Sequence, residues 1–131
     1  MAQKMSFSEL CEHARGRIEE IEPEELASKL REGDPGWVLI DVRENDEFRE
    51  GHLPGARGIG RGVLEFHIAD EVPDPETEIV LYCRGGNRSA LAADSLQRMG
   101  YTNVLSLRGG YREWTSDAAR PTTREGEPIR H

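Results

Sequence analysis

The sequence predicts an α/β fold in which helices cover both faces of a central, mostly parallel sheet of five strands. The apolar runs "WVLIDV" and "EIVLYC" lack polar alternation, as expected of strands that are buried on both faces. From Ile18 onward, short apolar runs alternate with helical patterns, which is typical of βαβ crossovers. In such sheets ligands bind beyond the carboxyl ends of the strands, so those ends hold the first candidate residues.

The amino-terminal segment predicts a short amphipathic helix, because Ser6 and Glu9 form a capping-box pattern. Its apolar face is expected to consist of Phe7, Leu10, Cys11 and Ala14. We interpret Cys11 as a small packed hydrophobe, with a role as a second, resolving thiol as the alternative. "RIEEI" then fits an edge strand, and "EPEELASKLREG" fits a helix that ends at Gly33.

The remaining elements alternate in the same way. "WVLIDV" predicts a strand, "ENDEFREG" a brief helix, "ARGIG" a short strand and "RGVLEFHIADEV" a longer helix. After the strand "EIVLYC", a helix over residues 87–100 is expected to pack through Ala92, Leu96 and Met99. "NVLSL" and "GGYREWTSDA" then predict the last strand and the last helix.

One domain is expected, at residues 18–118, between a helical extension at 1–17 and a polar tail at 119–131. A chain of 131 residues with 36% hydrophobic residues can bury a sufficient core without the support of disulfides or metals. The net charge of −8 argues against binding to nucleic acid or to an anionic membrane. Neither a transmembrane run nor a signal-peptide core is found, so the expectation is a cytoplasmic protein with free cysteines.

The residues that follow "EIVLY" predict an anion site around Cys83. Gly85 and Gly86 allow a sharp turn whose N–H groups face one centre, and the next helix begins at the same place. A free cysteine has a pKa of about 8.5, and helix N-termini and nearby arginines lower it. A plain glycine turn does not need two arginines, whereas Arg84 and Arg88 suit the binding of an oxyanion. The pattern therefore indicates a thiolate nucleophile whose electrophile is an anion. The expected anion-binding loop consists of Arg84, Gly85, Gly86, Asn87, Arg88 and Ser89.

Two segments, in this order, resemble the rhodanese family of single-domain sulfurtransferases. They are "DVRENDEFREGHLPGA" at 41–56 and "IVLYCRGGNRSALAADSLQRMGYTNVLSLRGGYREW" at 79–114, and the likeness extends over residues 18–118. The resemblance implies a three-layer rhodanese-like fold. It also implies that Cys83 takes a sulfane sulfur from thiosulfate or a related persulfide donor, releases sulfite, and holds a persulfide. The acceptor would be a thiol, cyanide or a sulfur-carrier protein, and the thiol chemistry needs neither a metal nor an organic cofactor.

Other functions use similar residues. A non-enzymatic sulfur carrier would need the same loop, whereas a regulatory binding module would be expected to lose the nucleophile. Cysteine-based phosphatases and arsenate reductases also place a cysteine and an arginine around an oxyanion. Five residues separate the two in Cys-x5-Arg phosphatases but four separate Cys83 and Arg88, and the shorter loop suits a sulfur better than a phosphate. The physiological donor and acceptor and the oligomeric state stay open at this point.

Three further residues are candidates for a pocket wall: Asp41, Arg43 and Arg61. We expect Asp41 and Arg43 mainly to fix the loop after their strand, and Glu47 is a local partner for Arg43. His52, in the turn "GHLPGA", is assigned a structural role, because a thiolate activated by its loop needs no general base.

Overall fold

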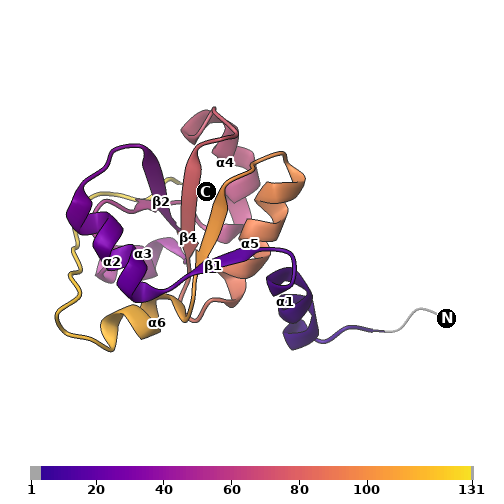
Figure 1. Cartoon of the computed structure of the whole chain (residues 1–131), viewed down its shortest axis with the longest axis horizontal. Helices are drawn as coiled ribbons and strands as arrows, with labels where there is room; N and C mark the ends of the chain where they lie inside the picture. Colours follow the sequence, from indigo (N-terminus) through magenta and orange to yellow (C-terminus); the bar gives the residue numbers. More distant parts are fainter. Residues whose placement is uncertain (1–3, 131) are drawn as a thin grey trace.

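The computed structural model describes residues 4–130 and shows a sheet of five parallel strands between two layers of helices (Figure 1). The strands are β1 (Glu19–Ile21), β2 (Trp37–Asp41), β3 (Arg57–Gly58), β4 (Glu78–Tyr82) and β5 (Val104–Leu107). Their order in the sheet is β1-β5-β4-β2-β3, and every neighbouring pair is parallel. The predicted fold class is therefore confirmed, as is the position of β1 at an edge.

Residues 4–130 also form six helices and one 3-10 turn. They are α1 (Phe7–Arg15), α2 (Pro23–Glu32), α3 (Asn45–Glu50), η1 (Arg61–Val63), α4 (Leu64–Glu71), α5 (Asn87–Arg98) and α6 (Gly110–Thr115). Each lies where the sequence pattern predicts a helix. Within residues 4–130, none of these helices is both long and apolar enough to span a bilayer.

Strand β4 lies in the middle of the sheet and divides its side chains between two cores. Ile79 and Leu81 pack in the core that holds the buried side chains of α4 and α5. Val80 and Tyr82 pack in the opposite core, with Leu26 of α2 and Trp114 of α6. All four strand residues are fully buried, which explains why this run shows no polar alternation.

Helix α1 packs beside α5 and outside the main layers of the fold (Figure 1). The predicted capping box is present, and Cys11 and Ala14 are buried. The rest of the predicted apolar face is wrong, because Phe7 is 57% exposed and Leu10 is 44% exposed. Of the four residues of the predicted face, the helix therefore buries only Cys11 and Ala14.

One other expectation, that Met99 packs on the core, needs correction. Met99 is 46% exposed, because α5 ends at Arg98 and the cap residue no longer faces the core. The described part of the polar tail is tied to the domain, because the Ile129 N–H donates to the Gly58 carbonyl at 2.8 Å. A Cβ on Gly58 would lie 2.8 Å from Pro128 Cβ, so only glycine lets the tail pack this close to β3.

Candidate active site

Cys83 follows directly on β4, at the carboxyl end of the central strand. Its sulfur accepts hydrogen bonds from the N–H groups of Gly86 at 3.1 Å and Ser89 at 3.3 Å. The Ser89 hydroxyl lies 3.5 Å from the sulfur and 2.8 Å from the hydroxyl of Ser106 in β5. The segment from Cys83 to Ser89, which we call the cysteine loop, therefore directs two of its N–H groups at the sulfur.

The backbone conformation of this loop depends on Gly86. Its φ of 98° lies in the left-handed region, and it serves as the N-cap of α5. This turn brings the Ser89 N–H, in the first turn of α5, and the positive end of the helix dipole toward the sulfur. Both N–H groups contact the sulfur directly, and the sulfur is shielded from solvent because Cys83 is only 1% exposed.

Helix α6 holds the other side of the loop. The Tyr111 N–H donates to the Cys83 carbonyl at 2.8 Å, and the Arg112 N–H donates to the Arg84 carbonyl at 2.9 Å. Gly110 has a φ of 60°, and a Cβ there would lie 2.5 Å from the Cys83 carbonyl oxygen. Gly110 is thus required by the close approach of α6 to the cysteine loop.

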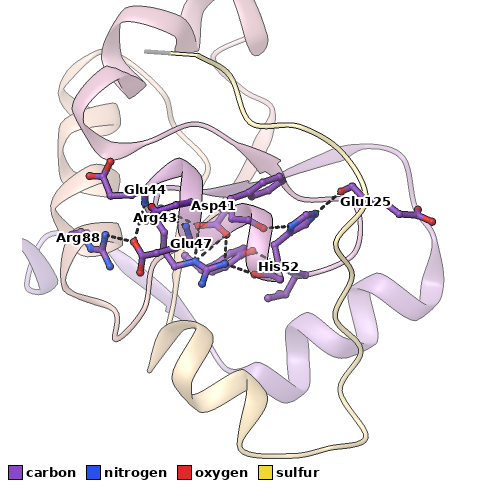
Figure 2. A network of polar contacts seen from close by, with 12 residues as sticks. Asp41, Arg43, Glu44, Glu47, His52, Arg88 and Glu125 are labelled. Carbon is purple, nitrogen blue, oxygen red and sulfur yellow. Dashed lines mark hydrogen bonds and ion pairs between the residues drawn. The ribbon is translucent and has the colours of Figure 1, made fainter.

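The two arginines of the loop differ in their surroundings. Arg84 is exposed and lines a pocket of about 330 Å³. The other residues around this pocket are Arg43, Glu47, Glu50, Gly51 and Tyr111. Arg88 instead donates to a carboxylate oxygen of Glu47 in α3 at 3.2 Å (Figure 2). Of the two positive charges predicted for the loop, that of Arg88 is therefore already paired with a carboxylate.

Glu47 is held in its charged form by this pair. Burial alone would raise the pKa of Glu47, but hydrogen bonds from the Glu44 N–H and from Arg88, and the charges of Arg88 and Arg43, lower it. The local pair predicted between Arg43 and Glu47 is replaced by the longer-range pair between Arg88 and Glu47.

Asp41 and Arg43 form a buried ion pair at the end of β2 (Figure 2). Arg43 donates from Nη2 to Asp41 at 2.8 Å, and also to the Gly51 carbonyl. Its guanidinium lies 4.1 Å from the ring centre of Tyr111. The expectation that this pair fixes a loop is confirmed, and Arg43 also lines the pocket beside Arg84.

His52 and Arg61 have partners of their own. The His52 ring nitrogens lie 2.7 Å from the carbonyl oxygens of Phe48 and Glu125 (Figure 2). Arg61 is paired with Glu65, at 2.7 Å and 2.9 Å. Among residues 4–130, neither side chain makes a hydrogen bond to the cysteine loop.

Sequence reasoning missed two residues that contact the loop. Ser106 contacts Ser89 and is a polar residue inside the apolar strand "NVLSL". This break in the apolar pattern could have indicated a polar contact at that position. Arg15 donates to the Asn87 side chain at 2.6 Å from a helix 72 residues earlier in the chain. No local pattern could have shown this second contact.

Comparison with known proteins places the chain in a family. The model of the "Rhodanese-like domain" matches residues 22–117. The chain is 37% identical over 99 residues to a putative mitochondrial thiosulfate sulfurtransferase of Schizosaccharomyces pombe, covering 67% of this chain and 70% of that protein. It is 35% identical over 100 residues to the thiosulfate sulfurtransferase GlpE of Pseudomonas aeruginosa, covering 76% and 86%.

Two other similarities carry different names. The putative sulfur carrier protein YrkF of Bacillus subtilis is 34% identical over 98 residues, but the chain spans only about half of it (51%) and 75% of this chain is covered. A solved structure from Rhodopseudomonas palustris is described as a protein of unknown function and a possible tyrosine phosphatase. It is 32% identical, with a TM-score of 0.79 that covers 92% of this chain and 98% of that one. The match of the rhodanese-like domain over most of the chain, together with the identities of these sulfurtransferases, shows that this protein belongs to the rhodanese family.

Proposed function

We propose that the protein is a thiosulfate sulfurtransferase and that Cys83 carries the sulfur as a persulfide. The observation that carries the proposal is the pair of N–H groups, from Gly86 and Ser89, directed at the Cys83 sulfur. These donors stabilise negative charge on the attacking sulfur without any rearrangement during the reaction.

The reaction divides into two displacements at sulfur. The Cys83 thiolate attacks the terminal sulfur of thiosulfate, a new S–S bond forms, and the S–S bond of thiosulfate breaks as sulfite leaves with its electron pair. The enzyme then holds a persulfide on Cys83. An acceptor such as cyanide or a thiol attacks the outer sulfur, and Cys83 leaves as a thiolate that its loop again stabilises.

Arg84 is the side chain that we assign to the first contact with the anionic donor. It is exposed and lies on the pocket beside the loop, whereas Arg43 on the same pocket is already paired with Asp41. Arg88 contributes less in the resting protein, because Glu47 already neutralises it. Thiosulfate is a dianion, so its contact with the exposed Arg84 is favoured by charge.

A sulfur carrier is the second candidate, favoured by the similarity to the Bacillus subtilis protein. The two functions share the persulfide and differ in its fate. An enzyme delivers sulfur to a small acceptor over many turnovers, whereas a carrier is loaded once and releases its sulfur to a protein partner.

Phosphatase or arsenate reductase activity fits the geometry less well, in spite of the description given to the Rhodopseudomonas palustris protein. A bound phosphate presents several oxygens that need donors between the cysteine and the arginine. In this loop the N–H groups of Gly86 and Ser89 are directed at the sulfur itself, and four residues separate Cys83 from Arg88.

The test is the intact mass of the reduced protein before and after brief incubation with thiosulfate. We expect the gain of one sulfur atom on Cys83, removed by cyanide with formation of thiocyanate. Cys83→Ser should abolish the gain, and Cys11→Ser should retain it. If the folded protein gains no sulfur, thiosulfate is not the donor, and if Cys83→Ser still gains it, Cys83 is not the nucleophile. Many turnovers of thiocyanate per protein support the enzyme, and a single turnover supports the carrier.

A further inference from the structure

Helix α1 reaches the cysteine loop through the side chain of Arg15. Its Nη2 atom donates to the Asn87 side-chain oxygen at 2.6 Å, which is a short, charge-assisted hydrogen bond. Asn87 is the first residue of α5, the helix whose N-terminus faces the Cys83 sulfur. Because the family match begins at residue 22, this arginine comes from outside the rhodanese-like domain.

The same guanidinium borders the residue that binds the sulfur. A Cβ on Gly86 would lie 3.8 Å from Arg15 Nη2, and the Gly86 N–H donates to the Cys83 sulfur at 3.1 Å. Arg15 therefore contacts one loop residue and lies beside another. A positive charge at this position favours negative charge on the nearby sulfur.

The electrostatics of α1 support this placement. Burial raises the pKa of Cys11, the charge of Arg15 opposes this rise, and negative charge on Cys83 adds to it. Both cysteines therefore lie within electrostatic range of each other, with Arg15 acting on the same region.

We propose that Arg15 is a positioning residue of the cysteine loop, and that α1 is thereby part of the active site. Arg15 holds Asn87 at the start of α5 and adds positive charge beside the thiolate and the persulfide of Cys83. This inference rests on the proposed function for its catalytic meaning, although the effect on the sulfur is independent of which donor is used.

The surroundings of Arg15 fix it in this position. Glu12 accepts from Arg15 Nη1 at 3.2 Å, and a Glu20 carboxylate oxygen lies 3.9 Å from Nε. The Arg15 side chain is 27% exposed, so solvent screens it only in part. These carboxylates offset some of its charge but keep the planar group aimed at Asn87.

A separate contact holds the segment just after α1 against α5 and supplies the control. Arg17 binds Asp94 with two hydrogen bonds, at 3.0 Å and 2.9 Å, near the middle of α5. Loss of Arg17 weakens the docking of the N-terminal segment without removing a contact to the loop. Arg15→Gln and Arg17→Gln thus remove the same charge from the same segment at two different places.

The first experiment compares alkylation of Cys83 by iodoacetate, an anion, with alkylation by neutral iodoacetamide, using peptide mapping. Both reagents consume the thiolate, so the ratio of the two rates reports the local positive charge. We expect Arg15→Gln to lower this ratio about two- to fivefold, which is the effect expected from the loss of one partly screened positive charge. Arg17→Gln should keep the wild-type ratio. An unchanged ratio in Arg15→Gln, or an equal fall in both variants, overturns the assignment.

The second experiment tests whether Arg15 acts through Asn87. In a double-mutant cycle of Arg15→Gln and Asn87→Ala, kcat/KM for thiosulfate should fall about three- to tenfold in each single variant, with little further loss in the double variant. Arg15→Lys should recover part of the loss, because it keeps the charge but not the planar donor group. Independent, multiplicative losses overturn the positioning role. If the wild-type protein takes no sulfur from thiosulfate, the proposed function fails, while the alkylation ratio still tests Arg15.

Discussion

Gly110 lies so close to Cys83 that a Cβ on it would be 2.5 Å from the Cys83 carbonyl oxygen and 2.7 Å from the carbonyl of Arg84. Both are backbone atoms, which cannot rotate away as a side chain can. The conformation of the residue that bears the nucleophile is therefore fixed by a glycine 27 positions later in the sequence.

Gly110→Ala should consequently displace the cysteine loop. Steric overlap with the backbone, added to the strain of a φ of 60°, is expected to lower the free energy of unfolding by about 2 to 4 kcal/mol. Denaturant unfolding measures this change, and the rate of Cys83 alkylation reports the loss of its donors. Gly85→Ala is the matched control, because a Cβ there has nothing within 4 Å, and it should keep nearly wild-type stability. Equal stability of the two variants would contradict the argument.

The hydroxyl pair beneath the sulfur gives a second prediction. Ser89 and Ser106 are both fully buried, and their oxygens lie 2.8 Å apart. Ser106→Ala leaves the Ser89 hydroxyl without this partner and should cost about 1 kcal/mol of stability. We also expect a shorter lifetime of the persulfide, measured by the decay of the added sulfur mass in thiol-free buffer. A lifetime equal to that of the wild type would show that Ser89 needs no support from β5.

Cys11 should react far more slowly than Cys83 with a neutral alkylating reagent at pH 7 to 8. Burial raises the pKa of Cys11 above its usual value, so the unreactive thiol form persists to more alkaline pH. Cys83 is equally buried, but its sulfur accepts hydrogen bonds from two N–H groups. Timed alkylation followed by peptide mapping gives both rates. Comparable rates would favour the alternative role of Cys11 as a resolving thiol.

His52 fastens the tail to the domain, so His52→Ala should release the tail selectively. Besides the bond from its ring to the Glu125 carbonyl, its backbone pairs with Thr123 in an antiparallel bridge. Hydrogen exchange of residues 123–129 is expected to rise at least tenfold, while β4 exchanges as before. His67→Ala, on α4, is the matched histidine control. Unchanged exchange in the tail would mean that Pro128 and Ile129 suffice to hold it.

The sequence predicts the layers of this fold well because they follow from local pattern. The unbroken apolar run of β4 and the glycine stop after α2 are visible in a few neighbouring residues, and so is the position of Cys83 at the end of its strand. Partners across the fold carry no such signal. The pairs Arg88–Glu47 and Arg15–Asn87 join residues 41 and 72 positions apart, and their partners depend on how α3 and α1 pack.

The same reasoning explains the errors in predicted exposure. Phe7 and Leu10 have the spacing of an apolar face, but α5 is a narrow partner and covers only Cys11 and Ala14. A periodic pattern indicates which residues can share a face, and the neighbouring element decides how much of that face is buried.

The pair of Arg88 and Glu47 leads to the last prediction, in which one substitution has opposite effects on stability and on donor binding. Glu47→Gln removes the carboxylate that neutralises Arg88, so this arginine becomes available to the anionic donor. KM for thiosulfate should fall about two- to fivefold, because the positive charge of Arg88, in partly solvated surroundings, can then attract the donor. Steady-state kinetics with cyanide as acceptor measure it, and an unchanged KM would mean that Arg88 does not face the donor.

The pH dependence of stability provides an independent check on this pair. The pKa of Glu47 is lowered in the folded protein, so its pairing stabilises the fold above the ordinary pKa of 4.5 and is lost as pH falls through the folded value. Glu47→Gln should therefore be less stable than the wild type at pH 7, by no more than about 1 kcal/mol because the pair is partly exposed. The difference should shrink when denaturant unfolding is repeated below pH 4.5, since the wild type then loses the same interaction. A difference that is constant between the two pH values would assign the loss to packing rather than to the charge on Glu47, and the gain in donor affinity would then need another explanation.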